Sequence, residues 1–365
     1  MKIAEITTYK EGGIYTHVTE LARNLHLPVI LVTGNSKKSG YEQEDDFTFY
    51  HVPCLFSFFD IYFINPPGSF HKVYQEIKQQ QVELLHIHGP LFTFGGGLLR
   101  KTGIPKVLTT HYILEFKGNR LLSFMYRIII RLVTKSMAQL VDKIICVNEE
   151  YLPIFQQWGI EKEKMVYIPN GVDTEKFSPG VSHIKEKLKC RHLVVFWGRL
   201  GYQKNIQLLI KAFQRCTTSD TKLVIIGKGP DLAKLKQLAA KNKNIIFLGY
   251  LSEPDLLEYA RGADVAVFPS RGESWGLVIA EAMAIGLPVI SSNVGKAAEL
   301  LGSDRGLLLN VETEENLAAM IDYVLQHKEY AQEMGKRARS YIVEHYSWKQ
   351  VAEQTKKIYM TLLDK

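Results

Sequence analysis

Residues 264–291 read DVAVFPSRGESWGLVIAEAMAIGLPVIS and carry the clearest indication of the fold. An apolar run ends at Phe268, a polar loop follows, and a helical pattern begins near Gly276, before a second apolar run at residues 288–291. Short runs that are apolar on both faces are typical of strands covered by helices on both sides. The stretch therefore predicts a βαβ unit of a parallel sheet.

The same alternation of short apolar runs and longer helical patterns continues along the whole chain. In the first half, the runs are residues 2–7, 29–33, 82–88, 106–110 and 143–147. In the second half, they are residues 192–197, 222–226, 244–248, 264–268, 288–291 and 306–309. The fold class that this pattern predicts is α/β, built on parallel sheets.

Turn-forming residues cluster between about Ile168 and Lys189, where the alternation weakens. A chain of 365 residues suggests two or three domains at roughly 100–200 residues each. We expect an N-terminal Rossmann-like domain at residues 1–172 and a C-terminal one at residues 173–346, facing across a cleft at the carboxyl ends of their sheets. Residues 347–365 form a separate amphipathic helical segment.

The composition limits the cellular compartments and the binding partners that we expect for this chain. The net charge of +7 favours acidic partners such as nucleotides, nucleic acid or an anionic membrane surface. The cysteines are scattered and form no C-x-x-C pair, which excludes zinc-ribbon and thioredoxin-type sites. The chain begins without a signal-peptide pattern and has no uncharged apolar run of about 18 residues. We therefore expect a cytoplasmic protein, with peripheral contact at the inner face of the membrane left open.

Two carboxylates flank the helix start in the opening stretch. Glu273 lies in the loop, and Glu281 follows eight residues later, a distance of roughly 12 Å at the rise of a helix. That separation suits two hydroxyl-rich groups, such as a ribose and a hexose, better than one metal ion. The helix start between them offers backbone N–H groups to phosphate. The alternative is that Glu281 is a solvated helix residue and Glu273 a helix cap.

Two cations follow the first strand of the second half, in residues 197–205, WGRLGYQKN. Arg199 suits bidentate binding of phosphate, and Lys204, which we expect to open a helix, supplies a point charge. Cations at a helix N-terminus oppose the helix dipole, so a bound anion would remove a penalty. Later loops at residues 227–230 and 249–252 either approach a base or phosphate through the backbone or are ordinary tight turns.

Taken together, the E-x7-E segment, the Gly-Arg-Leu and Lys-Asn loop and the Pro-Asn-Gly-Val-Asp linker at residues 169–173 resemble glycosyltransferase family 4. The resemblance covers essentially the whole chain and is strongest at residues 168–299. It implies the GT-B fold, with the final helix crossing back onto the N-terminal domain. It also implies a retaining glycosyltransferase that uses a nucleoside-diphosphate sugar as co-substrate, with no cofactor, no metal and no nucleic-acid partner.

The family likeness implies roles for residues of the C-terminal half. Arg199 and Lys204 would hold the donor diphosphate, and Glu281 would accept hydrogen bonds from the ribose. Glu273 would contact the transferred sugar. The amides near Gly276 and Leu277 would also contact the transferred sugar and the phosphates. Apart from the likeness, we expect Gly229, Tyr250 and Leu251, in the later loops at strand ends, to contact the donor. The catalytic residues expected on this basis are Arg199, Lys204, Glu273 and His111.

In the N-terminal half, Gly12 and Gly13 lie in a loop that the family uses to approach donor and acceptor. His111 resembles the family's cleft histidine near the transferred sugar. His86 and His88 point the same way along one strand, but a metal pair would need further ligands and none is apparent in the sequence. We expect one of the two to be packed, and His88, nearer the strand end, to face the acceptor together with His111.

One stretch departs from the family pattern. Residues 293–299, NVGKAAE, lack the two adjacent glycines that often precede the glutamate, so the pattern does not predict phosphate contact by this loop. Lys296 is a candidate for added positive charge there. No D-x-D follows a strand, so fixed cations and amides would stabilise the departing diphosphate. Front-side transfer with retention follows from the resemblance alone.

The acceptor side has two unusual stretches. Residues 55–64 are densely aromatic, and residues 121–133 are apolar but carry Arg127 and Arg131. A basic amphipathic helix beside an apolar loop docks on anionic lipid, whereas the alternative is a core helix with solvated arginines. Our hypothesis is a lipid-linked acceptor or cell-envelope glycan.

Two other functions remain open from the sequence. The enzymatic alternative is a sugar-nucleotide epimerase, which needs no acceptor surface. The non-enzymatic alternative is a nucleotide-sugar-binding regulatory subunit, which would bind donor without transferring the sugar. Nicotinamide and P-loop chemistry are disfavoured, because neither glycine-rich motif is present.

Overall fold

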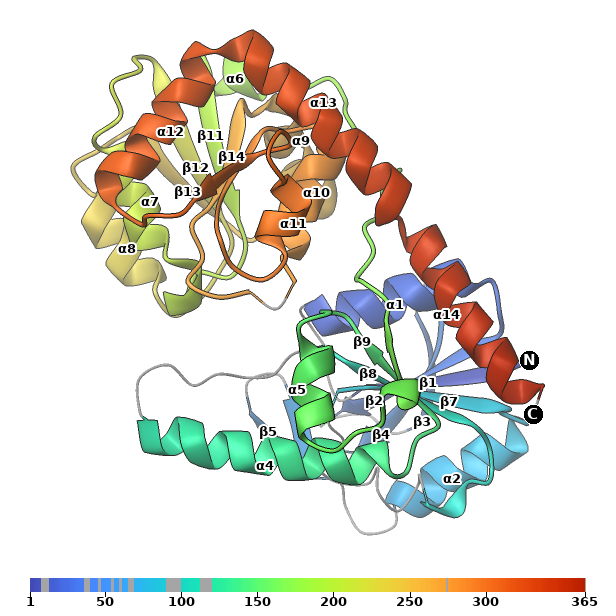
Figure 1. Ribbon diagram of the computed structural model, residues 1–365. Helices are drawn as coiled ribbons and strands as arrows, with labels where there is room; N and C mark the ends of the chain where they lie inside the picture. Colours follow the sequence, from blue (N-terminus) through green and yellow to red (C-terminus); the bar gives the residue numbers. More distant parts are fainter. Residues whose placement is uncertain are drawn as a thin grey trace. The chain divides into compact units, whose positions relative to one another are not determined.

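A computed structural model describes residues 1–7, 13–35, 40–44, 47–53, 56–58, 61–64, 69–89, 100–111, 120–273 and 275–364. The chain divides into two compact units. The first unit comprises Met1–Gly171 together with Trp348–Lys365, and the second comprises Val172–Ser347. Each unit has its own mainly parallel sheet, which confirms the predicted α/β class (Figure 1).

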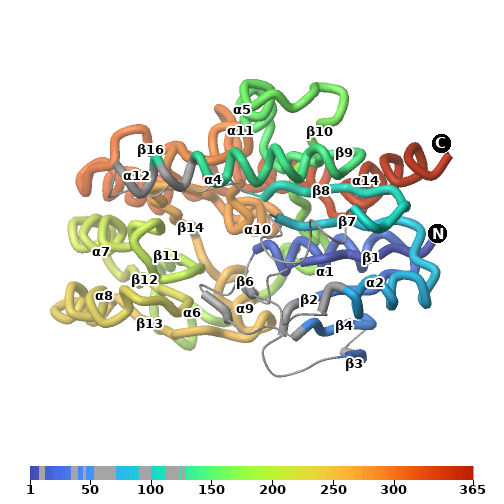
Figure 2. Tube along the Cα trace, turned by 90° about the horizontal axis from the view of Figure 1, so that it is seen from below, coloured from blue at the N-terminus to red at the C-terminus, as the bar shows by residue number. Residues whose placement is uncertain are grey.

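The sheet of the second unit has six strands, all parallel. They are β11 (His192–Trp197), β12 (Thr221–Ile226), β13 (Ile245–Gly249), β14 (Val265–Phe268), β15 (Val289–Ser292) and β16 (Leu307–Leu309). Their order is β13-β12-β11-β14-β15-β16, which is the order of a Rossmann sheet (Figure 2). The direction of the connections reverses between β11 and β14. Open α/β sheets bind ligands outside the carboxyl ends of the two strands at that point.

Helices of the second unit begin and end where the local chemistry requires. They are α6 (Ile184–Leu188), α7 (Ile206–Phe213), α8 (Leu232–Ala239), α9 (Glu253–Gly262), α10 (Leu277–Ile285), α11 (Ala297–Leu301), α12 (Glu314–Gln326) and α13 (Lys328–His345). Ser252 and Thr313 accept backbone N–H groups at the starts of α9 and α12. Gly286, at φ 82°, ends α10 in the left-handed region that glycine tolerates.

The sheet of the first unit has eight strands in the order β10-β9-β8-β7-β1-β2-β4-β3 (Figure 2). They are β1 (Ile3–Thr7), β2 (Val29–Asn35), β3 (Gly40–Glu44), β4 (Phe47–Pro53), β7 (Leu84–His88), β8 (Lys106–Thr110), β9 (Lys143–Cys146) and β10 (Met165–Tyr167). The connections reverse direction between β1 and β7. A separate antiparallel pair consists of β5 (Phe56–Phe58) and β6 (Ile61–Ile64).

The expectation of purely parallel sheets is wrong at the edge of this sheet. β3 pairs antiparallel with β4. The two strands are separated by only two residues in the sequence, and a parallel pair needs a crossover of about a dozen residues or more. The sequence interpretation had not assigned β3, β4, β5, β6 or β10.

The last helix, α14 (Trp348–Leu363), belongs to the first unit, as the family resemblance implied. It lies beside α1 (Gly13–Leu25) in Figure 1. Trp348 and Tyr359 of α14 pack in one cluster with Leu21 of α1 and with Ile3 and Leu84 of the central strands. The other α-helices that the structure describes in this unit are α2 (Ser69–Gln79), α4 (Arg120–Ala138) and α5 (Tyr151–Gln157). None of the described helices is both long enough and apolar enough to cross a bilayer.

The start of α14 explains the glycine of the Pro-Asn-Gly-Val-Asp linker. A Cβ atom on Gly171 would lie 2.5 Å from a ring carbon of Trp348 and 2.9 Å from its Cα. We expect Gly171→Ala to lower the free energy of unfolding by about 1–3 kcal/mol, because the added methyl group would clash with Trp348 and displace the start of α14. Urea denaturation measures this. Gly103→Ala is the matched control, since its Cβ would meet no atom within 4 Å; equal stability of the two variants would contradict the explanation.

Candidate active site

The candidate donor site of the second unit lies at the carboxyl ends of β11 and β14. Trp197 ends β11 and Phe268 ends β14, and both side chains are buried. The loops that follow are joined, because the backbone N–H of Arg271 donates to the carbonyl of Gln203 at 2.7 Å. The two segments that the sequence singled out therefore meet at the point where the strand order reverses.

Lys204 and Glu273 form an ion pair across these two loops. The Ser270 hydroxyl donates to the same Glu273 oxygen at 2.8 Å. The prediction that Lys204 opens a helix is wrong: Lys204 ends a short 3-10 turn, and α7 begins at Ile206. Asn205 causes the break, because its φ of 50° lies in the left-handed region. The ion pair with Glu273 holds the Lys204 ammonium in the site.

Glu281 is held by a partner that the sequence interpretation missed. The indole N–H of Trp197 donates to Glu281 Oε2 at 2.9 Å. Burial raises the pKa of Glu281. Glu281 is therefore not a solvated helix residue. The Trp197 ring is itself fixed edge-to-face on Phe268, with ring centroids 4.9 Å apart. The position of Trp197 at the end of a predicted strand was the available signal.

The other predicted donor residues differ in their surroundings. Arg199 is exposed and makes no ion pair with any residue that the structure describes. Gly229 has a packing reason to be glycine, because its Cβ would lie 2.2 Å from the Leu200 carbonyl oxygen. Tyr250 is 73% exposed, and its ring centroid lies 5.6 Å from the Lys228 ammonium. Leu251 is partly buried in the loop after β13.

The start of α10 offers backbone donors in this site. Gly276 precedes the helix at φ 105°, and no side chain caps it. The Ile279 N–H donates to the Gly276 carbonyl at 3.0 Å, whereas the N–H groups of Leu277 and Val278 have no acceptor within the helix. A helix start without a side-chain cap in the same site as the Lys204 ammonium is a suitable place for phosphate oxygens.

Lys296 does not add free charge to the site, contrary to the sequence interpretation. It is 7% exposed and ion-paired with Glu299, which also accepts the Tyr346 hydroxyl. Its backbone N–H donates to the Trp275 carbonyl at 3.1 Å. The loop after β15 is therefore joined to the loop before α10 through the backbone of Trp275.

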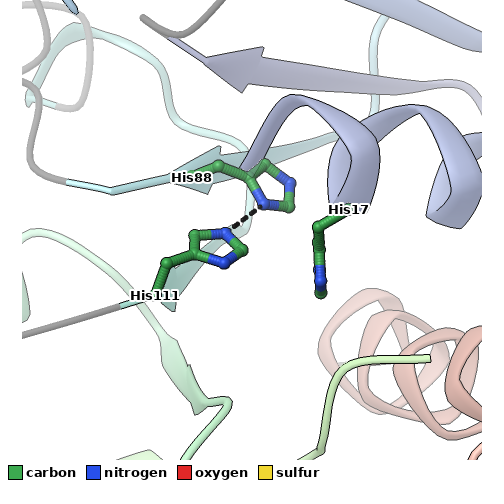
Figure 3. Close-up of side chains that lie close together, drawn as sticks. All are labelled: His17, His88 and His111. Carbon is green, nitrogen blue, oxygen red and sulfur yellow. Dashed lines mark hydrogen bonds between the residues drawn. The ribbon is translucent and has the colours of Figure 1, made fainter. Parts of the chain in front are cut away.

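The first unit holds a buried polar cluster on the sheet face that α1 and α14 cover. Parallel pairing of β1 with β7 sets Glu5 opposite His86, and His111 follows the neighbouring strand β8. The Glu5 carboxylate accepts from His86 Nδ1 at 3.2 Å and from His88 Nε2. His88 Nδ1 lies 3.2 Å from His111 Nε2, and the dashed line in Figure 3 marks this contact.

Two predictions for this unit change. His88 does not face an acceptor directly, since its side chain is fully buried between Glu5 and His111. His86 is also buried and bonds Glu5. His17, from α1, joins the same group (Figure 3) and was missed. Gly13 begins α1, whereas Gly12 lies outside the described residues.

The charges of the cluster follow from burial and proximity. Burial lowers the pKa of His88 to about 4 and that of His17 to about 3. Burial likewise lowers the pKa of His111 well below its ordinary value. For Glu5, burial opposes ionisation, but His86 and His88 outweigh it and lower the pKa. At neutral pH, Glu5 is charged and these three imidazoles are neutral.

The cluster has the composition of a metal site, which corrects the expectation that His86 and His88 lack further ligands. One atom from each of His17, His88 and His111 lies within 4.8 Å of the others, as does one from each of Glu5, His86 and His88. Neutral imidazoles are common metal ligands. Here, however, hydrogen bonds join Glu5, His88 and His111 directly. The cluster therefore balances its charges and polar groups without an ion.

Comparison with known proteins identifies the class. The model of glycosyl transferases group 1 matches residues 182–341, and that of Glycosyltransferase Family 4 matches residues 11–176. The fold and the two matched halves define a sugar transferase of the GT-B type, not an epimerase. The chain belongs to glycosyltransferase family 4, as its motifs suggested.

Individual relatives agree with this class. An uncharacterised glycosyltransferase of Methanocaldococcus jannaschii is 30% identical over 248 residues, which are 64% of this chain and 62% of that protein. The Escherichia coli UDP-Gal:alpha-D-GlcNAc-diphosphoundecaprenol alpha-1,3-galactosyltransferase is 26% identical over 368 residues, covering 94% of this chain and 92% of that protein. The crystal structure of Anabaena HepE with UDP-glucose matches with a TM-score of 0.80 at 18% identity, covering 99% of this chain and 100% of that chain.

Proposed function

We propose that this chain is a retaining, metal-independent glycosyltransferase that moves a hexose from a nucleoside-diphosphate sugar to a hydroxyl of a lipid-linked or cell-envelope acceptor. The observation that carries the proposal is the grouping at the carboxyl ends of β11 and β14. There, Lys204, Glu273 and Glu281 surround the uncapped start of α10. A carboxylate held by Trp197, a cation paired with Glu273 and unpaired amides at one strand junction suit a ligand that carries both hydroxyl groups and a diphosphate.

The roles within the donor site follow from chemistry. Glu281 Oε2 is occupied by Trp197, so its other oxygen accepts from the ribose hydroxyls. The exposed guanidinium of Arg199 binds diphosphate oxygens, and the α10 amides share that charge. Lys204 exchanges part of its contact with Glu273 for the leaving diphosphate. Glu273 is then available to a sugar hydroxyl.

A thermal-shift screen against UDP-, GDP- and ADP-sugars tests the donor assignment. A ligand at 100 times its Kd stabilises the protein by about 2.7 kcal/mol. We expect one nucleotide family to raise the Tm and the other two to leave it unchanged. If no nucleotide sugar shifts the Tm and none is transferred, the proposed function fails. Transfer with retention is then read from the anomeric coupling constant of the product, and EDTA should leave its rate unchanged.

The lipid-linked acceptor is supported by the E. coli relative, whose name specifies a diphosphoundecaprenol-linked acceptor, and by the surface of α4. Four large apolar side chains on α4 face solvent: Phe124, Ile128, Ile129 and Leu132 are 62%, 43%, 48% and 61% exposed. Arg131 and Lys135 are exposed on the same helix. A core helix would have covered these apolar residues. Exposed apolar side chains with neighbouring cations suit an anionic bilayer surface.

We expect the double variant Phe124→Ser and Leu132→Ser to weaken binding to anionic vesicles by about tenfold or more, since each buried apolar side chain contributes about 1.5–3 kcal/mol. Co-sedimentation at low salt measures this. The matched control is Val181→Ser with Val311→Ser, which removes two exposed apolar residues of the second unit. Equal loss in both variants, or no binding by the unaltered protein, would remove the membrane surface from the proposal.

The regulatory-subunit alternative makes a different prediction. Such a subunit binds donor but forms no product with any acceptor.

The aromatic segment at residues 55–64 does not help to distinguish a transferase from a regulatory subunit. Residues 54–55 and 59–60 lie outside the described part of the chain, and the side chains of the rest of the segment are not described. Product formation by the purified chain alone, with a polyprenyl-diphosphate-linked sugar as acceptor, would separate the two functions.

A further inference from the structure

The hydrogen bonds of the buried cluster in the first unit determine which ring nitrogen of each histidine carries the proton. The Glu5 carboxylate can only accept, so the His88 nitrogen that contacts it, Nε2, must carry the proton. Because His88 is neutral at ordinary pH, its second nitrogen, Nδ1, has none and can only accept. The proton between His88 Nδ1 and His111 Nε2 therefore belongs to His111.

The same logic extends to the far side of His111. A neutral His111 with its proton on Nε2 has an unprotonated Nδ1. No described residue donates to that atom. His17 is set similarly, because its Nδ1 donates to Asn170 Oδ1 at 2.6 Å and its Nε2 is left as an acceptor. The rings of His17 and His111 lie edge to face, with centroids 4.6 Å apart (Figure 3).

We propose that Glu5 is a positioning residue for the transfer reaction: through His88, it fixes His111 in the tautomer whose Nδ1 accepts a hydrogen bond from a sugar hydroxyl. The role rests on the proposed function and on the family resemblance, which implies that His111 lies near the transferred sugar. Glu5 touches no substrate itself, since it is fully buried. Its carboxylate is anchored from the other side by the Tyr359 hydroxyl, which donates to Oε1 at 3.0 Å.

The proposal explains a conflict in the sequence. A carboxylate in the centre of β1 is fully buried between apolar neighbours, which is costly unless its partners compensate. A leucine at that position would fill the core without this cost. Packing alone does not explain why three polar groups, Glu5, His88 and His111, are linked in series inside the core. Control of the His111 tautomer explains each of these hydrogen bonds, because carboxylates orient histidines and fix their tautomers in other active sites in the same way.

The first test is the tautomer of His111 in the unliganded protein. Long-range ¹H–¹⁵N NMR spectra distinguish protonated from unprotonated ring nitrogens. We expect His111 with the proton on Nε2 and none on Nδ1. In Glu5→Gln, the amide N–H₂ competes to donate to His88, so a fraction of His111 should carry its proton on Nδ1. A His111 that carries its proton on Nδ1 in the unaltered protein overturns the proposal, whatever the activity. So does a stoichiometric transition metal in the purified protein.

The second test is kinetic. We expect Glu5→Gln to lower kcat about 10- to 100-fold, with the donor KM changed by less than about threefold, because one oriented hydrogen bond in the transition state is lost. The matched control is Thr33→Val, which removes a buried hydrogen bond to His51 in the same unit but lies outside the path from Glu5 through His88 to His111. Its kcat should stay within about twofold of the unaltered protein. An unchanged kcat in Glu5→Gln, or an equal loss in both variants, contradicts the role. Absence of transfer by the unaltered protein with every donor would instead refute the proposed function and leave the NMR result standing.

Discussion

Arg199→Ala should lower turnover by about 100- to 1000-fold, the loss seen when one preorganised group that stabilises developing charge is removed. The diphosphate gains negative charge as the bond to the sugar breaks. Lys204 is already shared with Glu273, and Lys296 with Glu299. Arg199 is exposed beside the site and forms no ion pair with a described residue, so its whole charge is available to the departing group. Initial rates at saturating donor measure this effect.

Lys211→Ala is the control for that measurement. Lys211 lies on α7 in the same unit and pairs with Glu314 on the surface. Its loss lowers the net charge by the same amount but removes nothing from the site, so kcat should remain within about twofold. Similar losses in the two variants would mean that Arg199 acts through the general positive field of the protein, and its assignment to the diphosphate would be wrong.

The second unit shows what the sequence was able to predict. The strand that ends at Phe268 and the helix that begins after Gly276 were both predictable, because an apolar run, a glycine and a helical period coincide there. The start of α7 was misplaced by two residues. The residue directly before the helix is neither proline nor glycine, so the sequence carried no clear signal of the break. Asn205 delays the helix, because it tolerates the left-handed region better than most residues.

Contacts between distant strands were the harder part. Glu5 meets His86 only because β1 and β7 are neighbours, and residues 8–83 separate these strands in the sequence. A Rossmann strand order would have placed them side by side, but a glutamate in an apolar run reads as an isolated exception until its partners are known. Trp197 was missed for a similar reason. Its partner Glu281 lies on a helix that follows another strand of the sheet.

Glu281→Gln should weaken nucleotide-sugar binding about 10- to 100-fold, because a hydrogen bond to a charged group contributes about 1.5–3 kcal/mol. Trp197 holds one carboxylate oxygen and leaves the other to accept from the ribose. The amide is nearly the same size, so packing in the second unit is preserved. Isothermal titration with the preferred nucleoside diphosphate measures the change, and unaltered affinity would remove Glu281 from the donor site.

The pH dependence of that affinity provides a sharper measurement. Burial raises the pKa of Glu281 in the free protein, whereas hydroxyls that donate to the carboxylate favour its ionised form. Binding is therefore weakest below that raised pKa and strengthens as the pH rises through it, with uptake of the ligand releasing a proton. In Glu281→Gln this contribution is absent, so the difference between the two affinity profiles isolates Glu281 from the titration of the ligand's own phosphates. Parallel profiles would mean that the Glu281 carboxylate is already ionised before the nucleotide binds. The hydrogen bond from Trp197 would then be enough to offset the cost of burying the charge.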